Sequence, residues 1–343
     1  MSLTILITSV GGELSPEIIL SLKNSERYNL KVIGVDQNSN ATGKFFCDDF
    51  FTVPGGNNPL FVERIKEIVK LSAVDLIFPA SDEEALALSS AKSTFASMGT
   101  TVASVGSETL QMLTNKSLTY EKLSDAGLYV PQWKKVNERS ELPSVVEDMI
   151  NVCGDVVVKP ANARGGRGVY VISQSFMGGK SDSDFRESHV DLNQFFKLEL
   201  SNQDSTYPLI VMERLQEPVY DLDILAWDGM PVRLVGRKRI NSAVPNDGHV
   251  IVDNAELIEL GTKLVKLFNL SWLYDCDIMF DLQGRPCVLE INPRQSGSVA
   301  VSVAAGIPIF DDLISLYKRE SVANSTNVKV GTRIVPYKTL KVM

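Results

Sequence analysis

The run "LYDCDIMFDLQGRPCVLEINPRQSG", residues 273–297, contains two segments of strand character. The segments "DCDIMFD" and "PCVLEIN" flank "LQGR", whose Gly284 is typical of a tight turn, so the run predicts a β-hairpin. Asp277 lies in the first strand. Glu290 and Asn292 lie two residues apart in the second strand and therefore point to one face of the sheet.

These side chains predict a metal site. A carboxylate on one strand opposite a Glu-x-Asn pair on its partner brings hard oxygen donors together, and Mg²⁺ prefers such donors while keeping positions open for phosphates. We therefore predict that Asp277, Glu290 and Asn292 bind Mg²⁺, with Arg294 placing a positive charge nearby. The alternative is a solvent-facing amphipathic hairpin, which is disfavoured because the acid and the amide directly follow an apolar run.

The composition is that of a globular protein. The 343 residues suffice for about two or three cores, and the hydrophobic content of 44% and the charged content of 22% are globular values. The net charge of −8 disfavours nucleic-acid binding, which requires a basic surface. No apolar run reaches the length of a membrane span and the N-terminus lacks the features of a signal peptide, so we expect no membrane contact and a cytoplasmic location.

The cysteines and histidines exclude two kinds of metal site. Cys47, Cys153, Cys276 and Cys287 show no paired spacing, which favours reduced thiols over disulfides or a zinc site. The sequence contains only two histidines, so a histidine-rich metal centre is excluded as well.

Residues 1–112 alternate short apolar strands with helical segments, which predicts a doubly wound, Rossmann-like parallel sheet. Asp36 ends the second predicted strand, where a dinucleotide-binding acid would stand. The first loop, "SVGGELSP", is not G-x-G-x-x-G, so a nicotinamide-dependent dehydrogenase is disfavoured. A small-substrate or structural role is the favoured interpretation of this region.

A glycine-rich loop in the middle of the chain is suited to phosphate binding. Lys159 ends the apolar strand "DVVVKPA", and the loop "NARGGRG" follows before the strand "VYVIS". Gly165, Gly166 and Gly168 let backbone N–H groups approach an anion, whose charge Lys159 and Arg167 would neutralise. Such loops also occur in ordinary hairpins, so the loop alone leaves both interpretations open.

The strand end "VMERL" offers a place for a purine base. Its backbone leaves the strand at Glu213, Arg214 and Leu215, where carbonyl and N–H groups could bond the edge of the ring. Further along, Asp221 and Asp223 share a strand face. An ion pair with a neighbouring arginine explains Asp223 as well as a ligand role does.

Three arginines follow at strand-like spacing, Arg233, Arg237 and Arg239. Guanidinium groups on one face of a strand repel each other unless they meet anions. A phosphate or carboxylate substrate would supply those anions, and so would nearby Asp and Glu side chains.

Together these segments resemble the ATP-grasp family over nearly the whole chain. The loop "VVVKPANARGGRGV" and the segment "VLEINPRQSGSVAVSVAAGIPI" are most similar to the carbamoyl-phosphate-synthase-like branch. The resemblance implies an ATP-grasp fold of α/β and α+β character, preceded by the Rossmann-like domain. It divides the chain into a first domain 1–112, a small subdomain 113–211 with the connector helix and phosphate flap, and a large subdomain 212–343 with the adenine hinge and metal site.

The resemblance also implies roles for residues at matching positions. Asp277, Glu290 and Asn292 would bind the metal, Arg294 would stabilise a phosphorylated intermediate, and Arg239 would bind a second anion. The residues that would bind ATP are Lys116, Lys159, Gly165, Gly166, Arg167, Gly168, Glu213, Arg214, Leu215 and Asp221. Relatives often have glutamate at the position of Asp221, and some have glutamate at the position of Asp277. Aspartate is shorter, which changes the reach of the carboxylate but not the kind of ligand.

A chain with these residues is expected to be an ATP-dependent carboxylate–amine ligase that requires Mg²⁺ or Mn²⁺ and forms ADP, phosphate and an acyl phosphate intermediate. Its partners would be a small carboxylate and an amine, and relatives of this fold often form homodimers. The alternatives are phosphorylation of bicarbonate or carbamate, as in carbamoyl phosphate synthase, and non-catalytic ATP binding. The chain resembles one unit of that synthase, so the complete synthase reaction is not expected from it alone.

Overall fold

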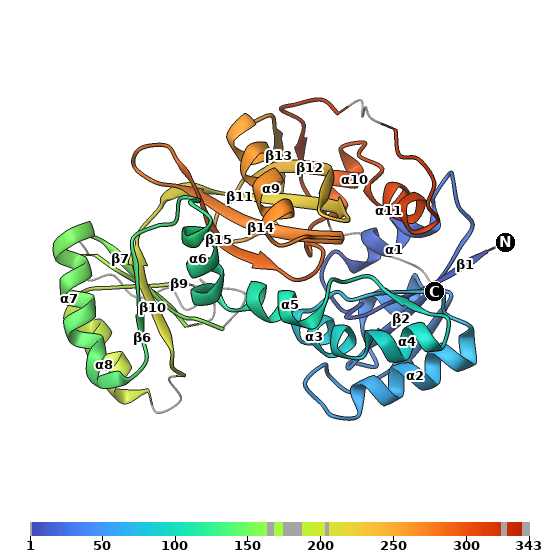
Figure 1. The fold of residues 1–343 in the computed structure, drawn as a ribbon, viewed down its shortest axis with the longest axis horizontal. Coiled ribbons are helices and arrows are strands. Elements are labelled where there is room, and N and C mark those ends of the chain that lie inside the picture. The colour runs from blue at the N-terminus through green and yellow to red at the C-terminus, as the bar shows by residue number, and fades with distance from the viewer. Residues whose placement is uncertain (1, 163–167, 174–186, 203–205, 324–327, 338–343) are drawn as a thin grey trace. The chain divides into compact units, whose positions relative to one another are not determined.

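The structure is a computed structural model that describes residues 2–162, 168–173, 187–202, 206–323 and 328–337 (Figure 1). The chain divides into two compact units. The first unit comprises Met1–Leu113, Pro218–Ile278 and Glu290–Met343, and the second comprises Thr114–Glu217 and Met279–Leu289. The predicted division into 1–112, 113–211 and 212–343 stays a prediction.

The first unit begins with a five-stranded parallel sheet in the order β3-β2-β1-β4-β5. Its strands are β1 Leu3–Ile7, β2 Leu30–Asp36, β3 Asp49–Thr52, β4 Leu76–Phe78 and β5 Thr101–Val102. Figure 1 shows α1 (Ser15–Lys23) on one side of this sheet and α2 (Phe61–Ser72), α3 (Asp82–Ser90) and α4 (Lys92–Ser97) on the other. The predicted doubly wound sheet is therefore confirmed.

The strands of this sheet are apolar on both faces because helices cover both faces. Leu6 and Ile33 are fully buried in the core on the α2 side, where they pack with Phe61 and Ile65. The 3₁₀ helix η1 (Thr42–Phe45) connects β2 to β3.

The second sheet of the chain has six strands in the order β15-β14-β11-β12-β13-β16. These are β11 Gln216–Trp227, β12 Met230–Arg239, β13 His249–Val252, β14 Trp272–Phe280, β15 Pro286–Asn292 and β16 Arg333–Ile334. Asp228 and Gly229 join β11 to β12 with positive φ angles of 47° and 73°, the conformation that an Asp-Gly hairpin turn requires. Gly284, with φ of 78°, lies in the turn between β14 and β15, so the hairpin predicted over residues 273–297 is confirmed.

The two faces of the six-stranded sheet differ in chemistry. Helix α9 (Ala255–Leu267) packs closely on an apolar face, since a Cβ atom on Gly261 would lie 2.7 Å from Cδ2 of Leu222. The opposite face is charged, and Ser302 of α10 (Ala300–Ala304) donates to Asp223 there at 2.5 Å. The charged face is where the predicted metal residues lie.

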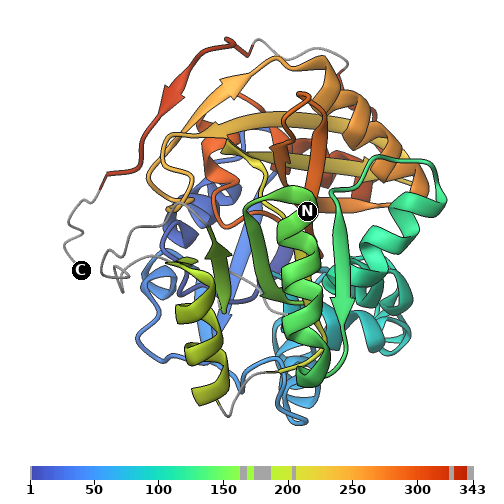
Figure 2. The ribbon, with the colours of Figure 1, turned by 90° about the vertical axis from the view of Figure 1, so that its left-hand side faces the viewer.

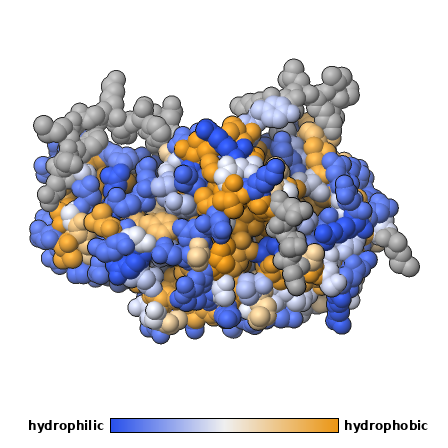
Figure 3. All heavy atoms as spheres, turned by 90° about the horizontal axis from the view of Figure 1, so that it is seen from above, coloured by the Kyte–Doolittle hydropathy of each residue, from blue (hydrophilic) through white to orange (hydrophobic). Residues whose placement is uncertain are grey.

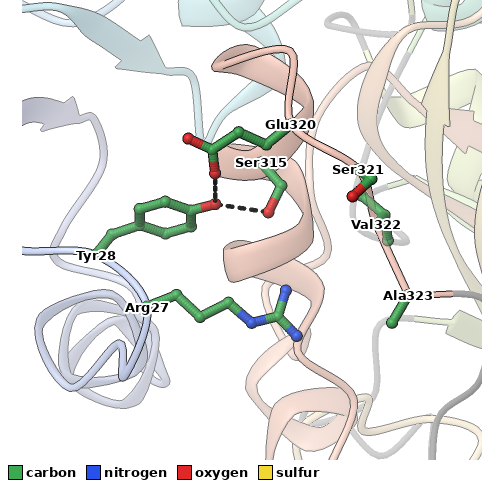
Figure 4. Close-up of a pocket in the computed structure, with 7 residues that line it drawn as sticks. All are labelled: Arg27, Tyr28, Ser315, Glu320, Ser321, Val322 and Ala323. Atoms are coloured by element: carbon green, nitrogen blue, oxygen red, sulfur yellow. Dashed lines mark hydrogen bonds between the residues drawn. The ribbon is translucent and has the colours of Figure 1, made fainter.

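The helix α11 (Ile309–Tyr317) is tied to the segment after α1 by polar contacts around a small surface pocket (Figure 4). The hydroxyl of Tyr28 bonds Ser315 at 2.7 Å and donates to Glu320 at 2.6 Å. Arg27 donates to Asp312 at 2.9 Å. These contacts fasten the C-terminal helix to the first domain.

The second unit contains a five-stranded sheet in the order β6-β10-β7-β8-β9. Its strands are β6 Trp133–Val136, β7 Val156–Pro160, β8 Val169–Ile172, β9 Glu187–Val190 and β10 Leu209–Glu213, and its helices are α6 Lys116–Asp125, η2 Arg139–Glu141, α7 Leu142–Cys153 and α8 Leu192–Ser201. Helix α5 (Ser107–Thr114) precedes it. Figure 2 shows α7 and α8 in front of this sheet, and Val146, Val158, Phe195 and Val211 share the core between them.

Some local expectations need correction. Residues 82–97 form two helices, α3 and α4, and the expected connector helix is divided into α5 and α6. Asn115 causes the second break, because its side chain accepts hydrogen bonds from the backbone of Ser117 and Leu118 and so caps a new helix.

Within the described ranges, no helix has the length and apolar character needed to cross a membrane. On the face drawn in Figure 3, hydrophobic side chains lie among hydrophilic ones. This face is therefore neither uniformly polar nor uniformly apolar.

Candidate functional site

A cluster of charged side chains occupies the face of the six-stranded sheet opposite α9. Cross-strand pairing places Asp221 opposite Arg237, and Arg239 opposite His249. Because side chains alternate along a strand, residues two apart join the same face. The cluster consists of Asp221 and Asp223 on β11, Arg237 and Arg239 on β12, His249 on β13, Asp275 and Asp277 on β14, and Glu290 and Asn292 on β15.

Arg239 bridges two acids of this cluster. Its Nε donates to Oδ2 of Asp221 at 3.0 Å, and its Nη2 donates to Oδ2 of Asp277 at 2.7 Å. His249 Nε2 lies 2.7 Å from Oδ2 of Asp221. Burial raises the pKa of the Asp221 carboxyl, but Arg239 and the hydrogen bond from His249 outweigh burial and hold that pKa below its ordinary range. Asp221 is therefore ionised in the folded protein.

The carboxylates of this cluster are not fully satisfied by the chain. Oδ1 of Asp277 and Oδ1 of Asp275 are buried and have no hydrogen-bond partner within the part of the chain that the structure describes. One oxygen each of Asp221, Asp275 and Asp277 lie within 4.8 Å of one another. Burial raises the pKa of Asp277 to about 6, although Arg239 acts in the opposite direction.

Asn292 and Arg294 extend the cluster toward the first domain. Nδ2 of Asn292 donates to Asp275 at 3.2 Å, and Nη2 of Arg294 donates to Oδ1 of Asn292 at 3.3 Å. Nε of Arg294 donates at 3.1 Å to Asp82, the first residue of α3. Arg294 therefore links the end of β15, in the hairpin of β14 and β15, to α3 of the first domain.

Glu290 lies close enough to Asp277 and Arg294 to shift the pKa values of both side chains. It raises the pKa of Asp277, after the larger effect of burial. Burial lowers the pKa of Arg294, but Asp82, Asp275 and Glu290 outweigh burial and raise that pKa above its ordinary value. The three predicted metal residues and Arg294 thus form one electrostatic group.

The donor set fits Mg²⁺. It offers carboxylate and amide oxygens, the hard ligands that this ion prefers. Oδ1 of Asp277 has no hydrogen-bond partner in the described ranges, and the acids of the cluster outnumber its arginines. A buried excess of negative charge is costly unless a cation compensates it.

The three arginines of β12 meet acids of the chain itself. Arg233 donates to Asp312 at 2.9 Å, and Arg237 donates to Asp223 at 2.7 Å. The predicted ion pair of Asp223 with a neighbouring arginine is confirmed. Arg239 has its partners in the cluster, so its predicted role toward a second anion stays a prediction.

The predicted phosphate lysines lie in the second unit. The register pairs Lys159 with Ile210, on the face of the sheet opposite Val158 and Val211 and hence away from α7. The backbone N–H of Lys116 donates to Ala161, two residues after Lys159, at 3.0 Å. Both lysines are buried, with 7% and 8% of the residue exposed. Two largely buried lysine residues could take part in binding an anionic ligand, and their role stays a prediction.

The flap residues Gly165, Gly166 and Arg167 lie outside the described residues. Gly168 follows them with φ of 70°, a backbone conformation that favours glycine. The strands on either side, β7 and β8, pair antiparallel, as a hairpin flap requires.

The predicted adenine hinge follows β10. Oε1 of Glu213 accepts a hydrogen bond from the backbone of Gln132 at 2.9 Å, and the backbone N–H of Arg214 donates to Asp155 at 3.1 Å. Leu215 is buried. The Glu213 side chain and the Arg214 N–H thus hold the segment in place, while its predicted recognition of adenine stays a prediction.

Sequence reasoning missed Asp275, Asp82 and His249. The alternation in "DCD" could have found Asp275, because it stands two residues before Asp277 on the same strand face. No local signal marks Asp82 or His249, whose partners lie far away in the sequence.

Two family models match the chain. Residues 5–103 match "PylC-like, N-terminal domain", and residues 205–340 match "ATP-grasp in the biosynthetic pathway with Ter operon". A comparison with curated proteins gave no match.

Solved structures share the fold over nearly the whole chain. N5-carboxyaminoimidazole synthetase from Staphylococcus aureus, complexed with ADP, is similar with a TM-score of 0.68 and 16% identity over 95% of this chain and 80% of that one. The biotin carboxylase domain of 2-oxoglutarate carboxylase from Hydrogenobacter thermophilus is similar with a TM-score of 0.68 and 14% identity, over 96% of this chain and 73% of that one. D-alanine–D-alanine ligase from Bacillus anthracis, complexed with ATP, is similar with a TM-score of 0.59 and 14% identity, over 93% of this chain and 98% of that one.

The matched segments agree with the structure. The first model covers the doubly wound sheet, and the second covers the six-stranded sheet with its charged face. The narrower resemblance to the carbamoyl-phosphate-synthase-like branch stays a prediction. Residues 205–340 are therefore similar to an ATP-grasp domain, and residues 5–103 are similar to a PylC-like N-terminal domain.

Proposed function

We propose that the protein is an ATP-dependent ligase that activates a carboxylate for attack by an amine or a similar nucleophile. The observation that carries the proposal is that Asp277, Glu290 and Asn292 share one face of the six-stranded sheet, within the segment that matches an ATP-grasp model. If these acids served only to form structural ion pairs, each would be expected to have a basic partner. Here Oδ1 of Asp277 has no hydrogen-bond partner within the described ranges.

The chemistry follows from the weakness of a carboxylate as an electrophile. Attack by an amine would have to expel oxide, which is a very poor leaving group. Transfer of the γ-phosphoryl group of ATP to a carboxylate oxygen gives an acyl phosphate, from which phosphate leaves readily. The amine then forms a bond to the carbonyl carbon, and the C–O bond to phosphate breaks.

Asp277, Glu290 and Asn292 would hold Mg²⁺. When bound, the ion would neutralise charge on the β- and γ-phosphates during transfer. Arg294 would place its guanidinium beside the phosphoryl oxygens, since it already contacts Asn292. Lys116 and Lys159 would supply further positive charge to the triphosphate.

The remaining nucleotide contacts follow the family resemblance. The flap around Gly165, Gly166, Arg167 and Gly168 would cover the phosphates, and the backbone of 213–215 would bond the adenine ring. Asp221 would hold the ribose. In the structure Asp221 accepts hydrogen bonds from Arg239 and bonds His249, so a ribose hydroxyl would have to share its oxygens.

A second candidate acid is bicarbonate. The biotin carboxylase domain with the same fold was crystallised with MgADP and the bicarbonate anion. The same first step would then form carboxyphosphate, a nucleophile would form a bond to its carboxyl carbon, and the C–O bond to phosphate would break to release phosphate. A homodimer and a cytoplasmic location also remain proposals.

A phosphate-release screen tests the function. The full-length chain with ATP and Mg²⁺ is assayed against amino acids and small carboxylic acids, with and without amines and bicarbonate. We expect ADP and phosphate in equal amounts with at least one acid. Saturable ATP binding by calorimetry without turnover on any acid would favour a non-catalytic ATP-binding protein, and the absence of both would reject the proposal.

A further inference from the structure

Asp275 is a buried acid that the proposed ligand set does not use. Its side chain is 6% exposed, and it shares the charged sheet face with Asp277. Oδ1 of Asp275 lies 3.8 Å from Nη2 of Arg237, but that nitrogen donates to Asp223 at 2.7 Å. Arg237 therefore pairs more closely with Asp223 than with Asp275.

The strongest contact of Asp275 is with a proposed metal ligand. Its Oδ2 accepts a hydrogen bond from Nδ2 of Asn292 at 3.2 Å, while Nη2 of Arg294 donates to Oδ1 of Asn292 at 3.3 Å. A guanidinium only donates, so Arg294 fixes which end of the amide is oxygen and leaves the Nδ2 end for Asp275. The oxygen faces away from Asp275.

We infer that Asp275 is a positioning residue that holds Asn292 with its oxygen directed toward the divalent cation. The inference rests on the proposed function, because it takes Asn292 as a metal ligand. An amide binds a hard cation through its oxygen alone, so a flipped amide would present N–H groups to the ion. Groups that orient metal ligands in this way typically contribute about 10- to 100-fold to metal affinity.

Asp275 could also act as a ligand or as a charge, since one of its oxygens lies within 4.8 Å of oxygens of Asp221 and Asp277. The two roles differ in what they require. Positioning requires a hydrogen-bond acceptor of the right length, which asparagine retains. Ligation through a negative charge requires the carboxylate, which asparagine lacks.

Calorimetric titration of the metal-free, full-length protein with Mn²⁺ separates these roles. We expect Asp275→Leu to weaken Mn²⁺ binding about 10- to 100-fold and Asp275→Asn to stay within about threefold of the wild type. The double variant Asp275→Leu with Asn292→Ala should bind no more weakly than Asn292→Ala alone, because both changes remove the same interaction. If Asp275→Leu does not fold, the comparison of Asp275→Asn with Asn292→Ala decides.

Three results would overturn the inference: unchanged affinity in Asp275→Leu, additive losses in the double variant, or a loss in Asp275→Asn as large as in Asn292→Ala. The outcome is separate from that of the phosphate-release screen. A wild type that binds Mn²⁺ through Asn292 but releases no phosphate rejects the ligase and leaves the positioning role standing. A wild type that does not bind Mn²⁺ rejects both.

Discussion

The guanidinium of Arg239 lies between two acids, and its Nη2 donates to Oδ2 of Asp277 at 2.7 Å while its Nε donates to Oδ2 of Asp221 at 3.0 Å. Arg239 therefore supplies part of the positive charge that these buried carboxylates need. A divalent cation at Asp277 would supply more. If the face binds a metal ion as proposed, its stability and its metal affinity are therefore expected to be linked.

Arg239→Met tests this link. The change leaves two buried carboxylates without their shared partner, and we expect the free energy of unfolding without metal to fall by about 3–5 kcal/mol. Mg²⁺ should then raise the thermal midpoint more in the variant than in the wild type, because the ion replaces the lost charge.

Arg233→Met is the matched control, since Arg233 pairs with Asp312 outside the cluster. It should lower the midpoint without increasing the effect of Mg²⁺. An equal or smaller Mg²⁺ effect in Arg239→Met would contradict the link.

Glu290→Gln removes a charge from the proposed metal site while keeping the shape of the side chain. We expect kcat for phosphate release to fall by at least about a hundredfold, the loss typical of removing one preorganised group that stabilises transition-state charge. Far-ultraviolet circular dichroism should show an unchanged fold. Glu256→Gln, the same change at an exposed position of α9, should keep full activity, and wild-type turnover of Glu290→Gln at limiting Mg²⁺ would count against the assignment.

Lys159→Ala removes a buried ammonium group from the proposed phosphate site. We expect calorimetry to show ATP binding weakened about 10- to 100-fold, the equivalent of one charge-assisted hydrogen bond. Lys135→Ala, at an exposed position of β6, is the control and should bind ATP as the wild type does. The same affinity in Lys159→Ala and Lys135→Ala would show that Lys159 does not contact the nucleotide.

His249 predicts a pH dependence of stability. Burial lowers the pKa of His249 below its ordinary value of 6.5, although the hydrogen bond with Asp221 acts in the opposite direction. Below pH 6.5 the unfolded chain binds a proton that the folded chain does not, so stability is full above this pH and falls as the pH decreases toward the folded-state pKa. The expected loss is up to about 1.4 kcal/mol per pH unit.

Urea unfolding at pH 7.5, 6.5 and 5.5 measures this loss. His249→Gln keeps an amide donor for Asp221 and does not titrate, so its stability should change less with pH than that of the wild type. His189→Gln, on β9 of the second unit, is the control. Parallel pH curves for the wild type and His249→Gln would contradict the prediction.

The sequence predicts those features that depend on neighbouring residues. The metal hairpin and the Asp-Gly hairpin follow from alternation and from turn residues that tolerate positive φ, as Asp228, Gly229 and Gly284 do. The doubly wound sheet follows from the alternation of apolar strands with helices. The strands β3 and β13 were not predicted, although the equally short β8 was.

The partners of the site residues could not be predicted, because strand order determines them. Arg239 meets Asp277 because β11 lies between β12 and β14, and no local pattern specifies that order. Arg294 and Asp82 are 212 residues apart and meet through the packing of the first domain on the metal hairpin. The contacts of Asp221 with Arg239 and His249 could not be predicted either, and its role toward ATP stays a prediction.

The anomalous scattering of Mn²⁺ in crystals grown with a non-hydrolysable ATP analogue tests the central claim most directly. The account predicts a peak within coordination distance, about 2.0–2.3 Å, of oxygens of Asp277, Glu290 and Asn292, with the analogue's terminal phosphates completing the coordination. A bound analogue with no manganese peak at these three side chains would contradict it.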